Sequence, residues 1–394
     1  MSIKTHNELA FSGLRVLDVS QGIAGPYCAM LLAQHGAEVI KLEPPTGDWS
    51  RGIGVRHGSH TAIDLMANRG KKSLVLDMKR PECLAASLRI ASQCDVMIEG
   101  FRPGVAAKLG ISYEQIQAVK ADIIYLSVSG FGQTGPRAQQ PATDTVVQAF
   151  SGMMSLNAEA DHRPRKIGFP AVDTLTGLYA FQAVSTALYR HLRSGAGCYL
   201  DVSLMQSTAA FLSPKLIETF FEGEAPLVIN SPAGVYQTQD GWIAITLSKE
   251  THFLALCKAI GLEALADDER FTSFVKRASH EKFLQDQISS VICTRKTDAW
   301  LACLESFGVL SSPAHTVTQW IQDPHVIANQ ATKIFNDPEL GDVLFPAIPG
   351  VSTPSDTDSR ALWPRVGEHS RDILHSMGFS SKEIDYLICE QPAK

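Results

Sequence analysis

Residues 15–43, RVLDVSQGIAGPYCAMLLAQHGAEVIKLE, contain one complete strand–helix–strand pattern. Residues 15–20 form a short apolar run typical of a buried strand, and residues 37–43 form a second one. Between them, residues 27–35 predict a helix, with a proline suited to its first turn and a glycine suited to its end. A helix between two strands is typical of a parallel pair, because parallel strands need a crossover connection. This stretch therefore predicts an α/β sheet.

The same alternation continues along the chain. Further strands are predicted at residues 73–78, 95–99 and 122–129, with helices at residues 81–92 and 113–120. Strands that alternate with helices in this way predict a doubly wound, Rossmann-like sheet. Ligands of such sheets bind at the carboxyl ends of the strands, so we expect the functional site in the loops that follow them.

The pattern changes after residue 222. A Gly- and Pro-rich segment, residues 222–234, precedes a predicted hairpin at residues 235–247 and several helices, which together indicate a smaller α+β domain. The tail from residue 336 to residue 364 is rich in proline and predicts loop. The predicted domains are a large Rossmann-like domain (residues 1–222), a small α+β domain (residues 223–330), and a C-terminal linker with helices that return to the large domain (residues 331–394).

Composition excludes several classes of function. Of the 394 residues, 45% are hydrophobic and 19% are charged, which is typical of soluble globular proteins. The net charge of −6 provides no general attraction to nucleic acid or to an anionic membrane. No apolar run approaches the roughly 20 residues that cross a bilayer, and the first residues are polar. The eight scattered cysteines indicate a reducing compartment. We expect a cytoplasmic protein without nucleic-acid or membrane partners.

Familiar cofactor motifs are missing. Gly22 and Gly25 lack the spacing of the dinucleotide fingerprint, and no phosphate-binding P-loop motif occurs. His57 and His60 lie in a Gly-rich loop without a carboxylate or thiol partner, which indicates a solvated loop and no metal site. Basic residues do cluster, and they form either a solvated face or a groove for a phosphate-bearing ligand. The cluster comprises Arg69, Lys71, Lys72, Lys79, Arg80, Arg102 and Lys108.

Asp173 stands where a Gly- and Pro-bounded loop enters the apolar helix of residues 178–192. It has two local interpretations. Aspartate is a favoured N-cap because its carboxylate accepts hydrogen bonds from the free amides of the first turn. It is also a competent nucleophile, since a carboxylate with a free pKa of about 3.9 is ionised at neutral pH. Local sequence does not separate these interpretations.

Taken together, motifs along nearly the whole chain resemble the family III CoA-transferases, the CaiB/BaiF type that includes formyl-CoA transferase. Each motif alone is weak, but the ordered set is specific. The motifs are GLRVLD (13–18), AGP (24–26), GAEVIKLE (36–43), NRGKKS (68–73), FRPG (101–104), SGFG (129–132), QAFSG (148–152), D-x-x-x-G (173–177) and GEH (367–369).

The resemblance implies that Asp173 is the catalytic nucleophile. In this family the carboxylate attacks an acyl-CoA thioester and forms a mixed anhydride. The released CoA thiolate then forms an aspartyl-CoA thioester, and an incoming carboxylic acid takes over the CoA. The chemistry needs no ATP and no tightly bound cofactor, because the anhydride keeps the acyl group activated. The expected ligands are therefore an acyl-CoA and a small carboxylic acid, both as substrates.

The resemblance also implies CoA contacts, and it gives the basic cluster the phosphates of CoA as a ligand. Two positions depart from formyl-CoA transferase: Pro44 and Lys108 both stand where that enzyme has arginine. Loss of a guanidinium at Pro44 removes a forked or stacking partner for the nucleotide. The expected CoA-binding residues are Ile23, Ala24, Arg69, Lys71, Leu76, Lys79, Gly100, Phe101, Arg102, Lys108, Ala142, Thr143 and Asp144.

Two other functions stay open. The α-methylacyl-CoA racemases share the fold and the aspartate, but they use a histidine at the position of Thr143, and threonine does not exchange a proton at neutral pH. A non-catalytic acyl-CoA-binding protein is the other alternative. The family also implies an interlocked homodimer in which linkers, here residues 222–234 and the proline-rich tail, thread through the partner.

Overall fold

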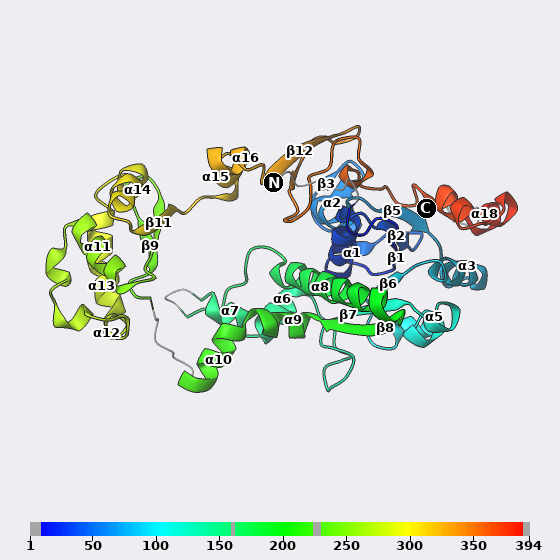
Figure 1. The fold of residues 1–394 in the computed structure, drawn as a ribbon, viewed down its shortest axis with the longest axis horizontal. Helices are drawn as coiled ribbons and strands as arrows, with labels where there is room; N and C mark the ends of the chain where they lie inside the picture. Colours follow the sequence, from blue (N-terminus) through cyan, green and yellow to red (C-terminus); the bar gives the residue numbers. More distant parts are fainter. Residues whose placement is uncertain (1–8, 159–161, 224–229, 389–394) are drawn as a thin grey trace. The chain divides into compact units, whose positions relative to one another are not determined.

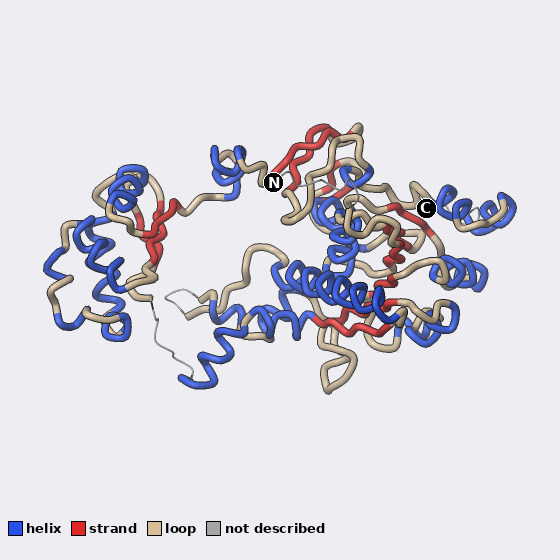
Figure 2. The backbone as a smooth tube through the Cα atoms, in the orientation of Figure 1, coloured by secondary structure: helices blue, strands red, loops and turns tan. Residues whose placement is uncertain are grey.

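The computed structural model describes residues 9–158, 162–223 and 230–388 (Figures 1 and 2). It divides into two compact units. The large unit consists of Met1–Ser213 together with Lys333–Lys394, and the small unit is Pro214–Thr332. The predicted small domain, residues 223–330, lies within the small unit. Residues 224–229 of the predicted linker are outside the described residues.

A six-stranded parallel sheet forms the centre of the large unit, with the order β5-β2-β1-β6-β7-β8. Numbered among themselves along the chain, these strands have the order 3-2-1-4-5-6, which is the Rossmann arrangement. The order reverses between β1 and β6, so the predicted α/β class is confirmed. The strands are β1 (Arg15–Asp18), β2 (Glu38–Glu43), β5 (Lys72–Val75), β6 (Val96–Glu99), β7 (Ile124–Ser129) and β8 (Cys198–Ser203).

Helices cover both faces of this sheet, because side chains along each strand alternate between two apolar cores. Val16 belongs to the core under α1 (Ala24–Gln34) and α8 (Ala171–Ser194), whereas its neighbour Leu17 belongs to the opposite core. Figure 1 shows α1 and α8 on one side of the strands and α3, α5 and α18 on the other. The second core is covered by α3 (Pro81–Ala91), α5 (Tyr113–Val119), α17 (Ser370–Ser376) and α18 (Ser381–Ile388).

Gly177 lets α1 and α8 pack closely. A Cβ atom at this position would lie 2.8 Å from both the carbonyl oxygen of Ala24 and the ring of Tyr27, so any other residue would push the helices apart. Because Gly177 is one turn beyond Asp173, this contact brings the start of α8 against the start of α1.

The segment between β2 and β5 has more structure than expected. It contains η1 (Trp49–Gly52), β3 (Arg56–His57), β4 (His60–Thr61) and α2 (Ala62–Asn68). The predicted loop of residues 336–364 is wrong in its first part, where β12 (Thr332–Asp337) and β13 (Gly341–Pro346) pair in a two-stranded sheet. Phe335 and Phe345 of these strands are buried against α2, which supplies the apolar partner that the isolated segment lacks. The remaining elements of this unit are α4 (Val105–Lys108), α6 (Asp144–Phe150), α7 (Met153–Leu156), α9 (Leu204–Phe211) and η4 (Ser359–Ala361).

The small unit has an antiparallel sheet of order β11-β10-β9. Strands β9 (Gly234–Gln237) and β10 (Trp242–Thr246) form the predicted hairpin, and β11 (Leu310–Pro313) pairs with β10. Its core gathers around the buried ring of Trp300. The helices are α10 (Ser213–Glu222, which spans the boundary), α11 (Glu250–Ile260), α12 (Phe274–Ala278), α13 (Glu281–Ile292), α14 (Thr297–Ser306), α15 (Val317–Ile321) and α16 (Pro324–Ala328), with the short turns η2 (Glu263–Leu265) and η3 (Glu269–Phe271).

Candidate active site

A pocket of about 280 Å³ lies where the order of the parallel sheet reverses. The loops that follow β1, β6 and β7 line it, together with the first turn of α8. Ligands of open α/β sheets bind at such a reversal, because the loops on its two sides diverge and leave a crevice. Its lining residues include Ile23, Ala24, Trp49, Gly100, Phe101, Arg102, Ala142, Thr143 and Asp173.

Asp173 is in the first turn of α8 but does not cap it. The capping carboxylate is Asp144 at the start of α6, whose Oδ2 accepts hydrogen bonds from the amides of Val172 (2.7 Å) and Asp173 (3.2 Å). Gln148 holds the other oxygen of Asp144. The N-cap interpretation of Asp173 is therefore wrong. Local sequence could not reveal this, because the true capping residue is 29 positions away.

The side chain of Asp173 lies in the pocket without a cationic partner among the described residues. Burial, and secondarily the negative charge of Asp144, raise the pKa of Asp173 to about 7. A carboxylate with a raised pKa is a more basic group, and its ionised form is a stronger nucleophile than an ordinary surface carboxylate. The site thus holds a carboxylate whose basicity is raised by its surroundings.

The pocket brings together more than half of the expected site residues. Asp144 lies immediately behind it, bonded to the backbone of Asp173. Trp49, which sequence reasoning missed, also lines the pocket and has a half-exposed indole ring. An aromatic residue in a loop at the carboxyl end of a predicted strand was the available signal. The expected residues that line the pocket are Ile23, Ala24, Gly100, Phe101, Arg102, Ala142, Thr143 and Asp173.

Besides Asp144, five of the expected CoA-binding residues do not line this pocket, and the basic cluster is dispersed. The ammonium group of Lys71 is buried and donates to Asp18, while Arg69 stacks on Phe345. Leu76 is buried in the core beneath α3. The side chains of Lys79 and Lys108 are exposed, on the loop after β5 and at the end of α4.

Lys71 belongs to a buried ionic network that supports the pocket from behind. Its ammonium group lies 2.8 Å from Asp18 Oδ2 and also donates to the carbonyl oxygen of Pro26. Lys41 pairs with Asp48 at 2.9 Å. Burial alone would raise the pKa of Asp18, but the charges of Lys41 and Lys71 outweigh it and hold that pKa below its ordinary value. These carboxylates are therefore structural.

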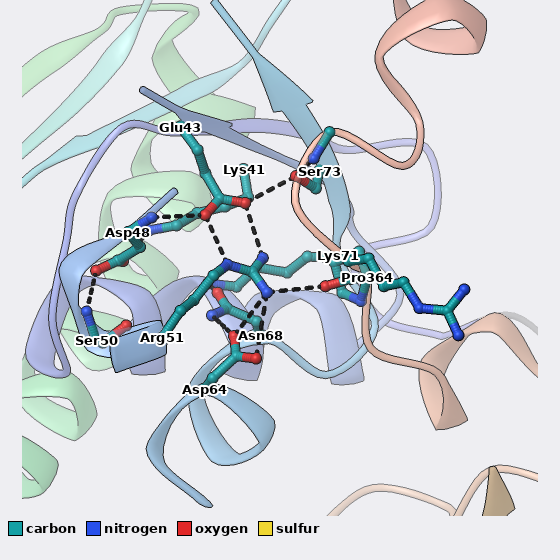
Figure 3. Close-up of polar contacts among 12 residues, drawn as sticks. Lys41, Glu43, Asp48, Ser50, Arg51, Asp64, Asn68, Lys71, Ser73 and Pro364 are labelled. Carbon is teal, nitrogen blue, oxygen red and sulfur yellow. Dashed lines mark hydrogen bonds and ion pairs between the residues drawn. The ribbon is translucent and has the colours of Figure 1, made fainter. Parts of the chain in front are cut away.

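Arg51 joins the second half of the network, which Figure 3 shows. Its guanidinium makes two 2.8 Å hydrogen bonds to Glu43, lies 3.1 Å from Asp64, and donates to the carbonyl oxygen of Pro364. His60 contacts Asp64 at 2.5 Å and is buried, so its predicted place in a solvated loop is wrong. Asp64 is only four residues beyond His60, so the carboxylate partner was present in the local sequence, but the helical turn of α2 that brings it to the imidazole was not predicted.

The network fixes the loop that carries Ile23 and Ala24. The carboxylate of Asp48 accepts a 3.0 Å hydrogen bond from the amide of Gly22, and Lys41 donates to the carbonyl oxygen of Ser20. Asp48 also precedes Trp49 directly, so one buried carboxylate orients two walls of the pocket.

Comparison with known sequences agrees with this arrangement. The profile of CoA-transferase family III matches residues 11–370. The chain belongs to CoA-transferase family III. Among relatives of this CoA-transferase, the succinate–glutarate CoA-transferase of Agrobacterium fabrum is 34% identical over 92% of this chain and 94% of its own length. The acetyl-CoA:oxalate CoA-transferase of Acetobacter aceti is also 34% identical, over 91% and 93%.

A solved structure that is similar to this chain belongs to the same family. A CaiB/BaiF family protein from Brucella suis superposes with a TM-score of 0.82 at 29% identity, over 94% of this chain and all of the other. Within the residues that the structure describes, no helix has the length and apolar character needed to span a membrane. Within the same residues, no group of histidine, cysteine and acidic side chains is arranged to hold a metal ion.

Proposed function

We propose that this CoA-transferase moves CoA between two carboxylic acids through covalent intermediates on Asp173. The observation that carries the proposal is the Asp173 carboxylate itself. It is partly buried, has no cationic partner among the described residues, and lies in the pocket at the sheet reversal, where its surroundings raise its pKa to about 7.

In the first step, an ionised Asp173 oxygen attacks the thioester carbonyl of the donor acyl-CoA. The C–S bond breaks, CoA thiolate leaves, and a mixed anhydride forms. The thiolate then attacks the aspartyl carbonyl carbon, which releases the donor acid as a carboxylate and leaves an aspartyl-CoA thioester.

In the second half, the acceptor carboxylate attacks that thioester and expels CoA thiolate, which gives a new anhydride. The thiolate attacks the acceptor carbonyl, so the new acyl-CoA leaves and the Asp173 carboxylate is restored. Over the whole cycle one CoA thioester is broken and another of similar energy is formed, which is why no nucleotide hydrolysis enters the balance.

The walls of the pocket support this chemistry over racemisation. Thr143 lines the pocket beside Asp173, and no histidine or lysine is among the described residues that line it. A two-base racemase needs a second group that exchanges a proton at neutral pH, and threonine is not one. The exposed guanidinium of Arg102 and the backbone of Gly100 and Phe101 are placed at the same opening, where they suit the phosphates and amides of CoA.

We infer that the acids are small dicarboxylates. The names of relatives include succinate, glutarate, oxalate and D-citramalate as substrates of those enzymes. A pocket of about 280 Å³ suits an acid of this size once the CoA thioester occupies its mouth.

A homodimer also belongs to the proposal. Exposed apolar side chains on the second half of α8 and on α10 support it: Leu192 is 83% exposed, and Phe220 and Phe221 are 82% and 78% exposed. Apolar side chains that gather on one surface are rarely left in water by a monomer. Sedimentation at several protein concentrations tests it.

Intact-mass spectrometry tests the mechanism. The enzyme is mixed with succinyl-CoA, glutaryl-CoA or oxalyl-CoA, quenched within seconds, and digested. An acyl or CoA adduct on the peptide that carries Asp173, missing in Asp173→Ala, is the expected result. Tight CoA binding with no adduct from any donor would overturn it, and deuterium entry at the α-carbon of a 2-methylacyl-CoA would then identify a racemase.

A further inference from the structure

A second pocket in the large unit has the features of an anion site. It encloses about 490 Å³ between α1, α2 and β13, and Asp173 is not among its lining residues. Most of its wall is apolar. The apolar lining residues include Met30, Leu65, Met66, Leu344, Phe345 and Ile348. Small-molecule sites share this combination of size and apolar lining with a few polar groups.

Arg69 is the cation of this pocket. Its residue surface is only 3% exposed, and the guanidinium carbon lies 4.6 Å from the ring centre of Phe345 and 5.7 Å from that of Phe335. No carboxylate of the described residues lies within ion-pairing distance of it, and its guanidinium donates no hydrogen bond to them. Burial lowers the pKa of Arg69 to about 10, so the group is still charged at neutral pH but incompletely compensated.

Tyr27 supplies a second polar group. Its side chain lines the same pocket, and the positive charge of Arg69 acts on its phenol, so the two groups are neighbours. Within the described residues its hydroxyl makes no hydrogen bond. A forked guanidinium and a phenol that converge without protein partners match a carboxylate, which accepts up to four hydrogen bonds in one plane.

The rim of the pocket is more mixed. His57 of β3 and Asp342 of β13 both line it and are exposed. Asp342 already accepts a 3.1 Å hydrogen bond from Asn336. The uncompensated charge is therefore positive and lies inside, while the exposed rim carries charges that water screens.

We propose that this pocket binds a small carboxylate with an apolar chain or ring, with its head group on Arg69 and Tyr27 and its body against α2 and β13. This site is separate from the Asp173 pocket, and the proposal stands whether or not Asp173 is the nucleophile. Tyr27 also packs on Gly177, so the bound carboxylate touches the residue that holds α1 against the helix of Asp173.

Calorimetric titration of the full-length protein with hexanoate tests the proposal, with hexanamide as the neutral control. Wild type is expected to bind hexanoate at least tenfold more tightly than hexanamide, because only the acid is charged. Arg69→Met is expected to lose about 10- to 100-fold in hexanoate affinity. Tyr27→Phe, which keeps the ring on Gly177, is expected to lose about 3- to 10-fold.

Two variants locate the site. Leu344→Trp fills the pocket from a half-exposed position and is expected to abolish hexanoate binding. Arg102→Met alters the Asp173 pocket and is expected to leave the hexanoate affinity unchanged. If Arg69→Met does not fold, Tyr27→Phe and Leu344→Trp still decide the matter.

Three results would overturn the proposal. One is unchanged hexanoate affinity in folded Tyr27→Phe and Leu344→Trp. Another is loss of binding only in Arg102→Met, which would place the acid beside Asp173. The third is no hexanoate binding by wild type; a changed sedimentation coefficient in Arg69→Met would then assign the guanidinium to a carboxylate of a second copy of this chain.

Discussion

Two regions of the large unit shift the pKa values of their carboxylates in opposite directions. In the ionic network, Asp18 lies against two ammonium groups and Glu43 against a guanidinium, and both pKa values are held low. In the pocket, Asp173 faces no cation among the described residues, and burial raises its pKa to about 7. Removal from water acts in both regions, so the presence of a cationic partner decides the direction of the pKa shift.

In this fold, carboxylates that hold the backbone in place are different from the carboxylate that can react. A paired carboxylate has its lone pairs occupied and its basicity reduced, so it holds backbone in place and does not attack a carbonyl. An unpaired one retains its basicity, at a cost in stability. The two regions are linked through Asp48, which orients both Gly22 and Trp49 beside the unpaired carboxylate.

The largest effect is expected from Asp173→Asn. We expect CoA transfer to fall on the order of 10⁴-fold or more, because the amide neither attacks a thioester nor carries the anhydride. Initial rates with saturating donor and acceptor measure this. The fold should be retained, because the amide fits the same space without burying a charge. Residual transfer above a hundredth of the wild-type rate would mean that Asp173 is not the nucleophile.

Breaking a pair in the network should damage stability instead. Lys71→Met leaves Asp18 with Lys41 as its one cationic partner among the described residues, at 3.7 Å, so we expect a loss of about 3–5 kcal/mol in the free energy of unfolding. Lys72→Met is the matched control one residue along. Its ion pair with Glu38 is exposed, so its removal should change stability by about 0.5 kcal/mol or less. Urea unfolding measures both, and equal losses would contradict the distinction.

Glu99 extends the comparison to a third carboxylate. It is buried at the end of β6 and accepts a 2.7 Å hydrogen bond from the amide of Phe101, and burial raises its pKa to about 7. The folded state therefore holds a proton that the unfolded chain releases, and stability falls as pH rises from about 4.5 to about 7.

Glu99→Gln removes that dependence and should raise stability above pH 7 by about 1–3 kcal/mol. Glu43→Gln is the counterpart with the opposite sign, since it leaves Arg51 without its forked partner and should destabilise the protein. Thermal unfolding at pH 5 and pH 8 measures both. A shift of stability in the same direction by both substitutions would contradict the distinction between paired and unpaired carboxylates.

The smallest effect is a shift in pH dependence. Asp173 attacks only when ionised, so kcat/KM should rise with pH through about 7 in the wild type. Asp144→Asn removes a negative charge and lowers the pKa of Asp173, which moves the rise to lower pH. Burial is the larger cause and persists, so the shift should be less than half of the interval between 3.8 and about 7. A pH–rate profile at low substrate concentration measures it.

The capping role of Asp144 gives this experiment its control. Asparagine keeps an oxygen that accepts from the amides of Val172 and Asp173, so α8 should begin at the same place. Asp144→Ala removes the acceptor as well, and should lower kcat in addition to moving the profile. Identical profiles for wild type and Asp144→Asn would show that the charge of Asp144 does not affect the pKa of Asp173.

Much of the fold was accessible from local sequence. Residues 15–43 predicted two parallel strands and a helix, and the structure has β1, α1 and β2 there within a few residues. The reason is physical: apolar runs and Gly or Pro boundaries act over a few residues, so the chain carries them wherever it lies. The tail containing β12 and β13 was missed, because its strands are stabilised by α2, which is distant in sequence.

The sequence by itself determined the α/β class, the position of Asp173 at the start of a long helix, and the ordered motifs of a CoA-transferase. Only the tertiary structure decided which charges are paired. Lys71 meets Asp18 across 53 positions and Asp144 meets the amide of Asp173 across 29, so these contacts exist only after distant strands and helices have packed together. Because the energy of a buried charge depends on its nearest partners, a carboxylate that is reactive and one that is structural look alike in a sequence and separate only in the folded chain.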